Sequence, residues 1–319
     1  MSMTSRPLGM SGAGSGRGRY RQGMTFDAGT ARLPVDLPVD LRSTGVAWSI
    51  HVRRLATGTT FGLGDGAVLS TASVGKLLLL AEAARRIEEG SLLQGERLTR
   101  TSADAVADSG LWQHLASDSL TVGDAAVLVA AVSDNLATNV LLRRVGVDAM
   151  GEVAQALGLE DVRLHDFVRD VRRESDPPRL SSGSARELSG FFARIAAGGM
   201  FSPAASEMLA GWLALNADLS MVASSLGLDP LAHAAGGHAL SLMNKTGTDA
   251  GVRADCGLVS CGGVDVAYAA IANWDEASVP MLDPVMADMR AIGGFVRSLV
   301  EIDGPRVSMP VVVNRAIIP

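Results

Sequence analysis

Apolar and polar positions alternate along this chain with two different periods. A period of two, typical of strands, runs through residues 45–52 and 60–63. The turn residues 56–59 lie between these runs, which predicts a hairpin. The strand period returns at 239–245, 253–260 and 264–272 with glycine-rich turns between the runs, and this spacing predicts an antiparallel meander near the other end of the chain.

The middle of the chain follows the helical period instead. The apolar run after Ser73 predicts a helix to Glu89, closed by Gly90. Thr121 and the Ser184–Glu187 capping box each mark a helix start. The remaining predicted helices are 125–132, 137–145, 147–157, 188–197, 202–213 and, after the meander, 284–300.

Strands at both ends and helices between them predict an α+β fold, an α/β sandwich. An antiparallel sheet flanked by helices is built from both chain ends, with an all-α subdomain inserted. The expected parts are a flexible N-terminal arm at 1–42, a sheet subdomain at 43–75 and 217–301, an all-helical subdomain at 76–216, and a C-terminal tail at 302–319. No role follows from the sequence for the arm or the tail.

Composition narrows the class of protein. A chain of 319 residues with 47% hydrophobic positions is long enough to bury a core in one large or two modest domains. The net charge of −6 argues against nucleic acid and anionic membranes as partners, and no apolar run approaches the length of a membrane span. Residues 1–23 lack the apolar segment of a secretory signal, so the expected location is cytoplasmic unless an unrecorded leader exists.

Cysteines and histidines give no sign of a metal site. Cys256 and Cys261 lie in one strand-like run and would point to opposite faces, which predicts two free thiols. The five histidines, His51, His114, His165, His233 and His238, lack the ligand spacing of a zinc site. We therefore predict no metal and no cofactor.

Candidate chemistry begins at Ser73-Val74-Gly75-Lys76, at the start of the apolar helix. Residues three apart share one helix face, so the lysine amine can reach the serine hydroxyl. Burial favours the neutral amine, which can take the serine proton. This string alone is common, and a helix cap with a solvated lysine explains it more simply.

Two further clusters carry polar groups at apolar boundaries. Ser133-Asp134-Asn135 separates two predicted helices, and such a trio is costly to bury unless its groups are paired. Lys245-Thr246-Gly247-Thr248 ends an apolar strand with a cation and a hydroxyl, and Gly247 has no Cβ to keep a substrate away from the strand.

In this order, the three clusters resemble the Ser-x-x-Lys, Ser-Asp-Asn and Lys-Thr-Gly motifs of class A β-lactamases and penicillin-binding proteins. The resemblance covers roughly residues 44–301 and includes Asn139 and the Ser-Gly-Leu at 109–111. It implies a serine hydrolase that opens an amide, lactam or ester through an acyl-enzyme on Ser73. Lys76 would be the general base, and Ser133 would relay a proton to the leaving nitrogen.

The resemblance also implies how a small-molecule, carboxylate-bearing substrate binds. Asn135 would hold its amide side chain, and Lys245 and Thr246 would bind its carboxylate. The backbone N–H groups of Ser73 and Thr248, beside Gly247, would form the oxyanion hole. Arg253 is either a second cation for the carboxylate or a surface cross-strand residue, and the oligomeric state stays open.

One departure from the family concerns the step that frees the acyl-enzyme. Class A β-lactamases activate water with a glutamate in a Glu-x-x-x-Asn segment, and residues 162–178 contain no such segment. Matching Arg163-Leu164 to the start of this loop places the glutamate position near Val168. Asp166, Asp170 and Glu174 are substitutes, although pairing with the loop's arginines explains them more simply.

Acylation is therefore expected to be intact, and efficient β-lactam hydrolysis is in doubt. Two alternatives follow from the same resemblance. The first is a D-alanyl carboxypeptidase or acyltransferase of the same fold. The second is a non-catalytic relative that binds a β-lactam or a peptide.

Overall fold

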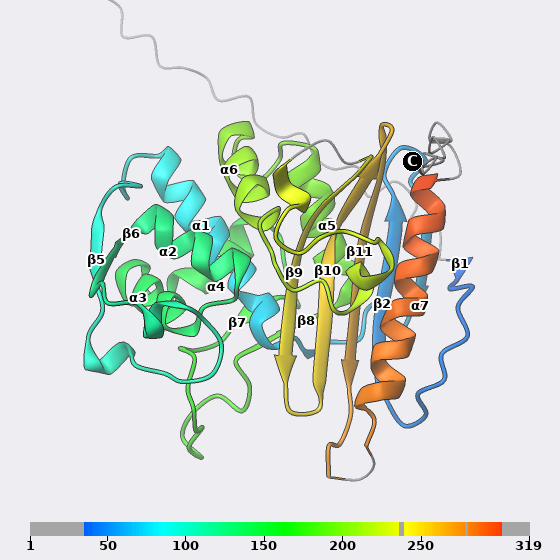
Figure 1. The fold of residues 1–319 in the computed structure, drawn as a ribbon, viewed down its shortest axis with the longest axis horizontal. Coiled ribbons are helices and arrows are strands. Elements are labelled where there is room, and N and C mark those ends of the chain that lie inside the picture. Colours follow the sequence, from blue (N-terminus) through cyan, green and yellow to red (C-terminus); the bar gives the residue numbers. More distant parts are fainter. Residues whose placement is uncertain (1–34, 236–238, 278–279, 302–319) are drawn as a thin grey trace, which may run out of the picture. The chain divides into compact units, whose positions relative to one another are not determined.

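A six-stranded sheet, in the order β1-β3-β2-β11-β10-β9, lies at the centre of the structure (Figure 1). Its strands are β1 (Val35–Asp36), β2 (Ala47–Arg54), β3 (Thr60–Leu63), β9 (Leu240–Asp249), β10 (Val252–Cys261) and β11 (Val264–Asn273). Neighbouring strands are antiparallel, except that β1 runs parallel to β3. β2 pairs with β11, Ile50 opposite Ala270, and so joins the early hairpin to the late meander. The predicted antiparallel sheet built from both chain ends is confirmed.

The computed structural model describes residues 35–235, 239–277 and 280–301, which all belong to one compact unit. Most of the predicted arm, the whole predicted tail and His238 lie outside these residues. The described end of the arm is tied to the domain. β1 pairs with β3, and the N–H groups of Arg42 and Ser43 each donate to the Asp288 carboxylate at 2.9 Å.

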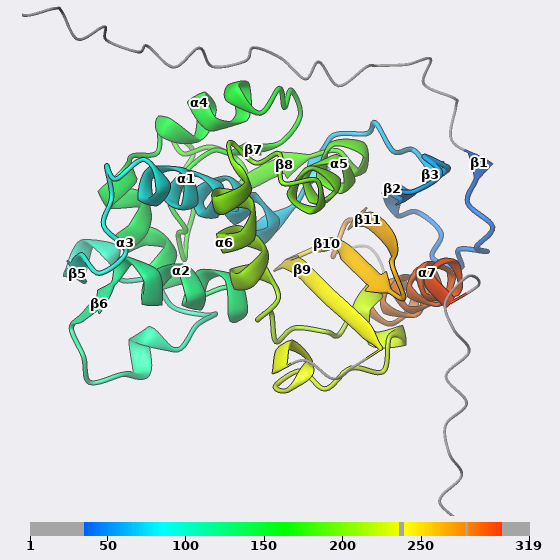
Figure 2. The ribbon, with the colours of Figure 1, turned by 90° about the horizontal axis from the view of Figure 1, so that it is seen from above.

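Helices cover both faces of the sheet (Figure 2). α5 (Ala185–Ala196) packs on one face and α7 (Leu282–Glu301) on the other. Side chains alternate along β10, so Cys256 belongs to the core under α5, whereas Cys261 packs against the core under α7. Both cysteines are free thiols on opposite faces of the strand, as predicted.

The other helices lie beside the sheet (Figure 1). They are α1 (Lys76–Glu88), α2 (Val122–Ala131), α3 (Asn135–Val145), α4 (Ala149–Ala156) and α6 (Pro203–Leu213). α1 is the central helix, because every residue from Lys76 to Ala84 is buried and α2, α3, α4 and α6 all contact it. The predicted caps form: Thr121 Oγ1 accepts from Asp124 N, and Ser184 Oγ accepts from Glu187 N.

Two small sheets and several short turns complete the described structure. The small sheets contain β4 (Leu69–Ser70), β8 (Ser181–Gly183) and β7 (Arg163–Leu164) in one, and β5 (Arg97–Thr99) and β6 (Ser119–Thr121) in the other. Short 3-10 helices occur at Ala72–Gly75, Ser102–Asp104, Trp112–His114, Val222–Ser225 and His233–Ala235. None of the described helices is long and apolar enough to span a bilayer.

Two element boundaries differ from prediction at functionally relevant places. The helix predicted from Ser73 begins as a 3-10 turn and becomes α-helical only at Lys76. The left-handed backbone of Ala72, with φ of +46°, prevents a regular helical start. β9 continues four residues beyond Lys245 to Asp249, because β10 pairs with it along its full length. Lys245 is therefore an interior residue of the strand.

Candidate active site

Ser73 lies on the 3-10 turn Ala72–Gly75, directly before α1. β8 holds this turn, because Ser181 Oγ is 2.5 Å from the Ala72 carbonyl oxygen and 2.7 Å from Thr71 Oγ1. The positive φ of Ala72 is a strain of the kind that concentrates at functional sites. Ser73 lines a cleft, and its hydroxyl makes no hydrogen bond with any residue that the structure describes.

Lys76 is completely buried at the first position of α1. Its Nζ lies 2.7 Å from Ser133 O, 2.7 Å from Asn135 Oδ1 and 3.2 Å from Ser133 Oγ. The first two atoms only accept, so they match the two N–H groups of a neutral amine and leave its lone pair for a hydroxyl proton. Burial, followed by the charge of Lys245, lowers the pKa of Lys76 well below its ordinary value. Lys76 is therefore suited to accept a proton.

The loop between α2 and α3 is built around a buried carboxylate. Asp134 Oδ2 accepts from Leu111 N at 2.6 Å and Trp112 N at 2.8 Å, and its Oδ1 caps α3 through Ala137 N at 2.8 Å. Ser133 sits beside it with φ of +54°, which turns this residue out of the helical path. The pairing explains how a polar trio is tolerated between two apolar helices.

Lys245 approaches Ser133 from the sheet. Its Nζ donates to Ser133 Oγ at 3.0 Å and to the Thr246 carbonyl oxygen at 2.8 Å. Burial lowers the pKa of Lys245 to about 8. The Ser133 hydroxyl therefore lies between two buried lysines, and their mutual repulsion favours the state in which Lys76 is neutral and Lys245 is charged.

Gly247 allows β9 to pack directly against the Ser73 turn. A Cβ at this position would collide with the Thr71 carbonyl oxygen and lie 3.1 Å from the backbone nitrogens of Ser73 and Val74. β9 is also the edge strand of the sheet, so alternate N–H groups on its free side have no strand to bind. The backbone of Ser73 thus lies beside the end of β9 that carries Thr248.

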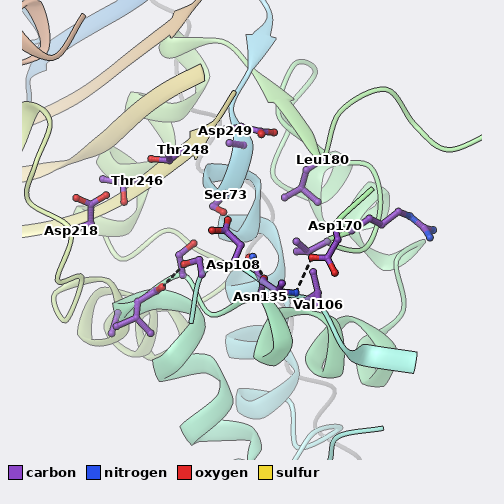
Figure 3. Close-up of a pocket in the computed structure, with 18 of the residues that line it drawn as sticks. Ser73, Val106, Asp108, Asn135, Asp170, Leu180, Asp218, Thr246, Thr248 and Asp249 are labelled. Atoms are coloured by element: carbon purple, nitrogen blue, oxygen red, sulfur yellow. Dashed lines mark hydrogen bonds between the residues drawn. The ribbon is translucent and has the colours of Figure 1, made fainter. Parts of the chain in front are cut away.

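These residues surround a cleft of about 1010 Å³ (Figure 3). The predicted residues among its lining are Ser73, Ser133, Asn135, Thr246, Thr248 and Asp170. Lys76 and Lys245 lie beneath this lining, where both contact Ser133. The structure thus brings the three predicted motifs together around one cleft.

Comparison with known proteins places this arrangement in a family. The family model for the β-lactamase enzyme family matches residues 37–283, which is most of the chain. The chain belongs to the β-lactamase enzyme family. A curated β-lactamase from Streptomyces albus G is 25% identical over 183 residues, covering 55% of this chain and 58% of that protein. The chain therefore spans somewhat more than half the length of this curated relative.

Solved structures agree on the fold. The β-lactamase from Sphaerobacter thermophilus DSM 20745 aligns with a TM-score of 0.71 and 20% identity, covering 82% of this chain and 94% of that one. PBP-A aligns with a TM-score of 0.68 and 20% identity, covering 81% and 92%. Similarity at this identity shows the fold alone, and it confirms the predicted β-lactamase-like α+β architecture.

The loop after β7 is where this β-lactamase-family chain departs from the expected pattern. Val168 stands near the position predicted for the water-activating glutamate, and it lines the cleft. The Asn139 side chain fixes its backbone, accepting from Val168 N at 2.8 Å and donating to Val168 O at 3.0 Å. Val168 thus places an apolar side chain near the position where the family resemblance implies a carboxylate.

Of the three substitute carboxylates, only Asp170 lines the cleft. Asp166 is buried and paired with Arg169 at 2.6 Å and Arg172 at 3.3 Å. Burial raises the pKa of Asp166, but the hydrogen bonds from Arg169 and the Phe167 N–H, together with the charges of Arg169 and Arg172, outweigh burial and hold the pKa below its ordinary value. Glu174 is exposed and lies outside the cleft lining.

Arg253 does not reach the cleft lining. Its Nη1 donates to the carbonyl oxygens of Asp249 at 3.0 Å and Val252 at 2.7 Å. Its guanidinium lies 5.8 Å from the centre of the Trp274 ring. Two backbone carbonyl groups thus hold the guanidinium beside Trp274, and the role of Arg253 as a second carboxylate-binding cation stays a prediction.

Three acidic residues of the cleft lining were missed from sequence: Asp108, Asp218 and Asp249. Asp108 and Asp218 lie in loops, where no periodicity marks a functional side chain. The available signal for Asp108 was its place directly before the Ser-Gly-Leu at 109–111, which belongs to the family resemblance. Within the described ranges, no group of three or more His, Cys, Asp or Glu side chains could hold a metal ion.

Proposed function

We propose that this protein is a serine hydrolase that works through an acyl-enzyme on Ser73. Ser73 Oγ attacks the carbonyl carbon of an amide, lactam or ester, and its proton passes to neutral Lys76. The bond from that carbon to the leaving atom then breaks, and Ser133 supplies a proton to a leaving nitrogen. Water later releases the acyl group and regenerates the serine.

The observation that carries this proposal is the placement of Ser133 Oγ between two buried lysines, 3.2 Å from Lys76 Nζ and 3.0 Å from Lys245 Nζ. A proton taken up by Lys76 has a direct path to the Ser133 hydroxyl. Lys245 is hydrogen-bonded to the other side of Ser133 Oγ. Its charge stabilises the negative charge that builds on this oxygen when the Ser133 proton leaves. A purely structural serine has no need of two desolvated amines.

Substrate recognition is proposed at the sheet side of the cleft. A charged lysine has three N–H donors, and Lys245 uses two of them on Ser133 and Thr246. The third N–H and the Thr246 hydroxyl, which lines the cleft, are available for a substrate carboxylate. The N–H groups of Ser73 and Thr248 are proposed to bind the developing oxyanion.

Intact-protein mass spectrometry tests the proposal directly. Incubation with benzylpenicillin or a fluorophosphonate is expected to add one adduct mass to the wild-type protein, located on Ser73 by peptide mapping. Ser73→Ala is expected to show no adduct, while its folding is checked by circular dichroism. Absence of an adduct with every acylating probe would contradict the proposal and favour a non-catalytic binding protein.

A second candidate function, a D-alanyl carboxypeptidase or acyltransferase, is favoured by one observation. Val168 occupies the region of the expected water-activating glutamate, and Asp170 has one carboxylate oxygen bound to Ala107 N at 2.8 Å. Slow deacylation by water follows, which leaves time for an amine to take the acyl group. Faster loss of the adduct in the presence of D-alanine or glycine would support the acyltransferase; loss independent of added amine supports the hydrolase.

A further inference from the structure

Carboxylates outnumber free cations along the cleft. The acidic side chains that line it are Asp108, Asp170, Asp218 and Asp249 (Figure 3). Arg169 and Arg172 also line the cleft, but both are paired with Asp166, at 2.6 Å and 3.3 Å, and Arg169 also lies 3.8 Å from Asp176. The charges of these two arginines are therefore already compensated.

Asp108 and Asp170 form one side of the cleft, which we call the acidic wall. Asp170 Oδ1 accepts from the backbone of Ala107, the neighbour of Asp108, so the two carboxylates are held on adjoining segments. The Asp108 carboxylate makes no hydrogen bond or ion pair with any described residue, and its backbone is left-handed with φ of +70°. Figure 3 shows its side chain directed into the cleft on the side of Ser73.

The acidic wall is electrostatically connected to the catalytic lysines. Burial and Lys245 lower the pKa of Lys76, and the charge of Asp108 acts against that lowering. On the sheet side, by contrast, the charges of Lys245 and Arg253 both interact with Asp218. The uncompensated negative charge of the cleft therefore lies at the acidic wall.

An independent sign of a polar ligand lies on the opposite side. Thr246 is only 3% exposed, yet its hydroxyl has no hydrogen-bond partner among the described residues. The residue lines the cleft, and beside it Lys245 keeps one N–H unused. The unpaired hydroxyl of Thr246, beside a lysine with an unused N–H, offers two donors to a ligand acceptor, which is the chemistry of a carboxylate.

We propose that the acidic wall binds a cationic group of the acyl donor, a primary ammonium or a guanidinium. The same substrate places its carboxylate on Lys245 and Thr246, so the preferred substrate is a zwitterion with its two charges on opposite sides of the scissile carbonyl. This inference rests on the proposed acylation of Ser73. It names a charge preference that acylation alone does not require.

Three penicillins with one nucleus and different side chains test the charge preference. Ampicillin carries an ammonium, benzylpenicillin carries no charge at this position, and carbenicillin carries a second carboxylate. The second-order rate constant for acylation of Ser73, measured by mass spectrometry, is expected to fall in the order ampicillin, benzylpenicillin, carbenicillin. The spread is expected to shrink as salt increases.

Variants of the acidic wall locate the effect. Asp108→Asn and Asp170→Asn are each expected to lower the ampicillin-to-carbenicillin rate ratio about fivefold, the upper range for one exposed ion pair. Asparagine at 170 keeps an acceptor for Ala107 N. Asp148→Asn is the matched control, because Asp148 is exposed, lies outside the cleft lining and changes the net charge equally.

The outcomes separate this inference from the proposed function. Equal acylation rates for the three penicillins, or an unchanged ratio in both acidic-wall variants, would overturn the zwitterion preference while acylation of Ser73 stands. A ratio that falls equally in Asp148→Asn would also overturn it, because the effect would then come from net charge. If no probe acylates Ser73, the inference falls together with the proposed function.

Discussion

Ser133 Oγ lies 3.0 Å from Lys245 Nζ, and Lys245 forms no ion pair with a carboxylate in the described part of the chain. A buried lysine without an acidic partner is costly, since burial disfavours its charged form. The charges of Asp218 and Asp255 act on Lys245 only from a distance, so its ammonium has no contacting carboxylate among the described residues. We infer that the charge of Lys245 is retained for substrate and for the Ser133 hydroxyl.

Ser133→Ala tests the proton relay. Acylation by benzylpenicillin is expected to slow by about a hundredfold, the low end of what general acid catalysis contributes, because the leaving nitrogen loses its proton donor. An aryl ester should lose much less, since a phenolate leaves without protonation. Stopped-flow acylation of both substrates measures the two effects, and equal losses would show that Ser133 has another role.

The pH dependence of acylation follows from the two lysines. Lys76 must be neutral to act as base, so the rate rises as pH increases through its lowered pKa. Lys245 must be charged to bind a carboxylate, so the rate falls as pH exceeds its pKa of about 8. A bell-shaped profile of the second-order rate constant is expected for penicillins.

A neutral ester provides the control for this profile. It has no carboxylate for Lys245, so its alkaline decline should weaken while the acidic limb remains. In the Lys76→Ala variant, the acylation rate should fall at every pH by far more than the roughly tenfold, equivalent to 1.4 kcal/mol, that loss of a surface charge would cause. A rate close to wild type in that variant would remove Lys76 as the base.

Much of the fold follows from local pattern. The period-two runs predicted β9, β10 and β11, and the capping residues Thr121 and Ser184 predicted two helix starts. The 3-10 turn at Ser73 was not predictable, because its conformation is imposed by contacts with Ser181 and Gly247 that lie far away in the sequence.

The site, like the fold, was predictable only where the signal lies within a short stretch of sequence. Motif order was enough to propose that Ser73, Ser133 and Lys245 meet, since each motif contains its chemistry within a few residues. The carboxylates that line the cleft could not be ranked in the same way. Asp166 and Asp170 are four residues apart, yet only the second faces the cleft, because side-chain direction in an irregular loop depends on tertiary contacts.

Val168→Glu tests whether the missing carboxylate limits deacylation. Asn139 holds the backbone of Val168 through two hydrogen bonds, and Val168 already lines the cleft. A glutamate there is expected to activate water and speed loss of the penicilloyl adduct by up to about a hundredfold. The rate is measured by the decay of the adduct mass after excess penicillin is removed.

Val168→Gln is the matched control, because it has the same shape as glutamate and no basic group. Faster decay in both variants would point to loosening of the loop rather than to base catalysis. Asp170→Ala and Glu174→Ala address the native carboxylates in the same assay. An unchanged decay rate in either variant removes that residue as the water-activating group.

A buried carboxylate behind β9 gives a prediction about stability. Asp255 Oδ1 accepts from Asn244 Nδ2 and from Tyr268 OH, both at 3.0 Å, and its Oδ2 accepts from Ala223 N at 3.2 Å. Burial nevertheless raises the pKa of Asp255 to about 6. Because the folded-state pKa exceeds that of the unfolded chain, the folded state binds the proton more tightly. This contribution to stability is present at low pH and is lost as pH rises through about 6.

The free energy of unfolding should therefore contain an Asp255 contribution that falls by about 1.4 kcal/mol between pH 5 and pH 7.5, because pH 5 lies about one unit below the folded-state pKa of about 6. His51 acts in the opposite sense below pH 6.5, since burial lowers its pKa to about 4. The quantity to measure is thus the difference between wild type and Asp255→Asn in urea unfolding at each pH, in which the His51 contribution cancels. The asparagine cannot ionise, so the variant should be least stable relative to wild type at pH 5 and recover relative to it by pH 7.5. A difference that stays constant with pH would show that Asp255 keeps the same protonation state throughout this range.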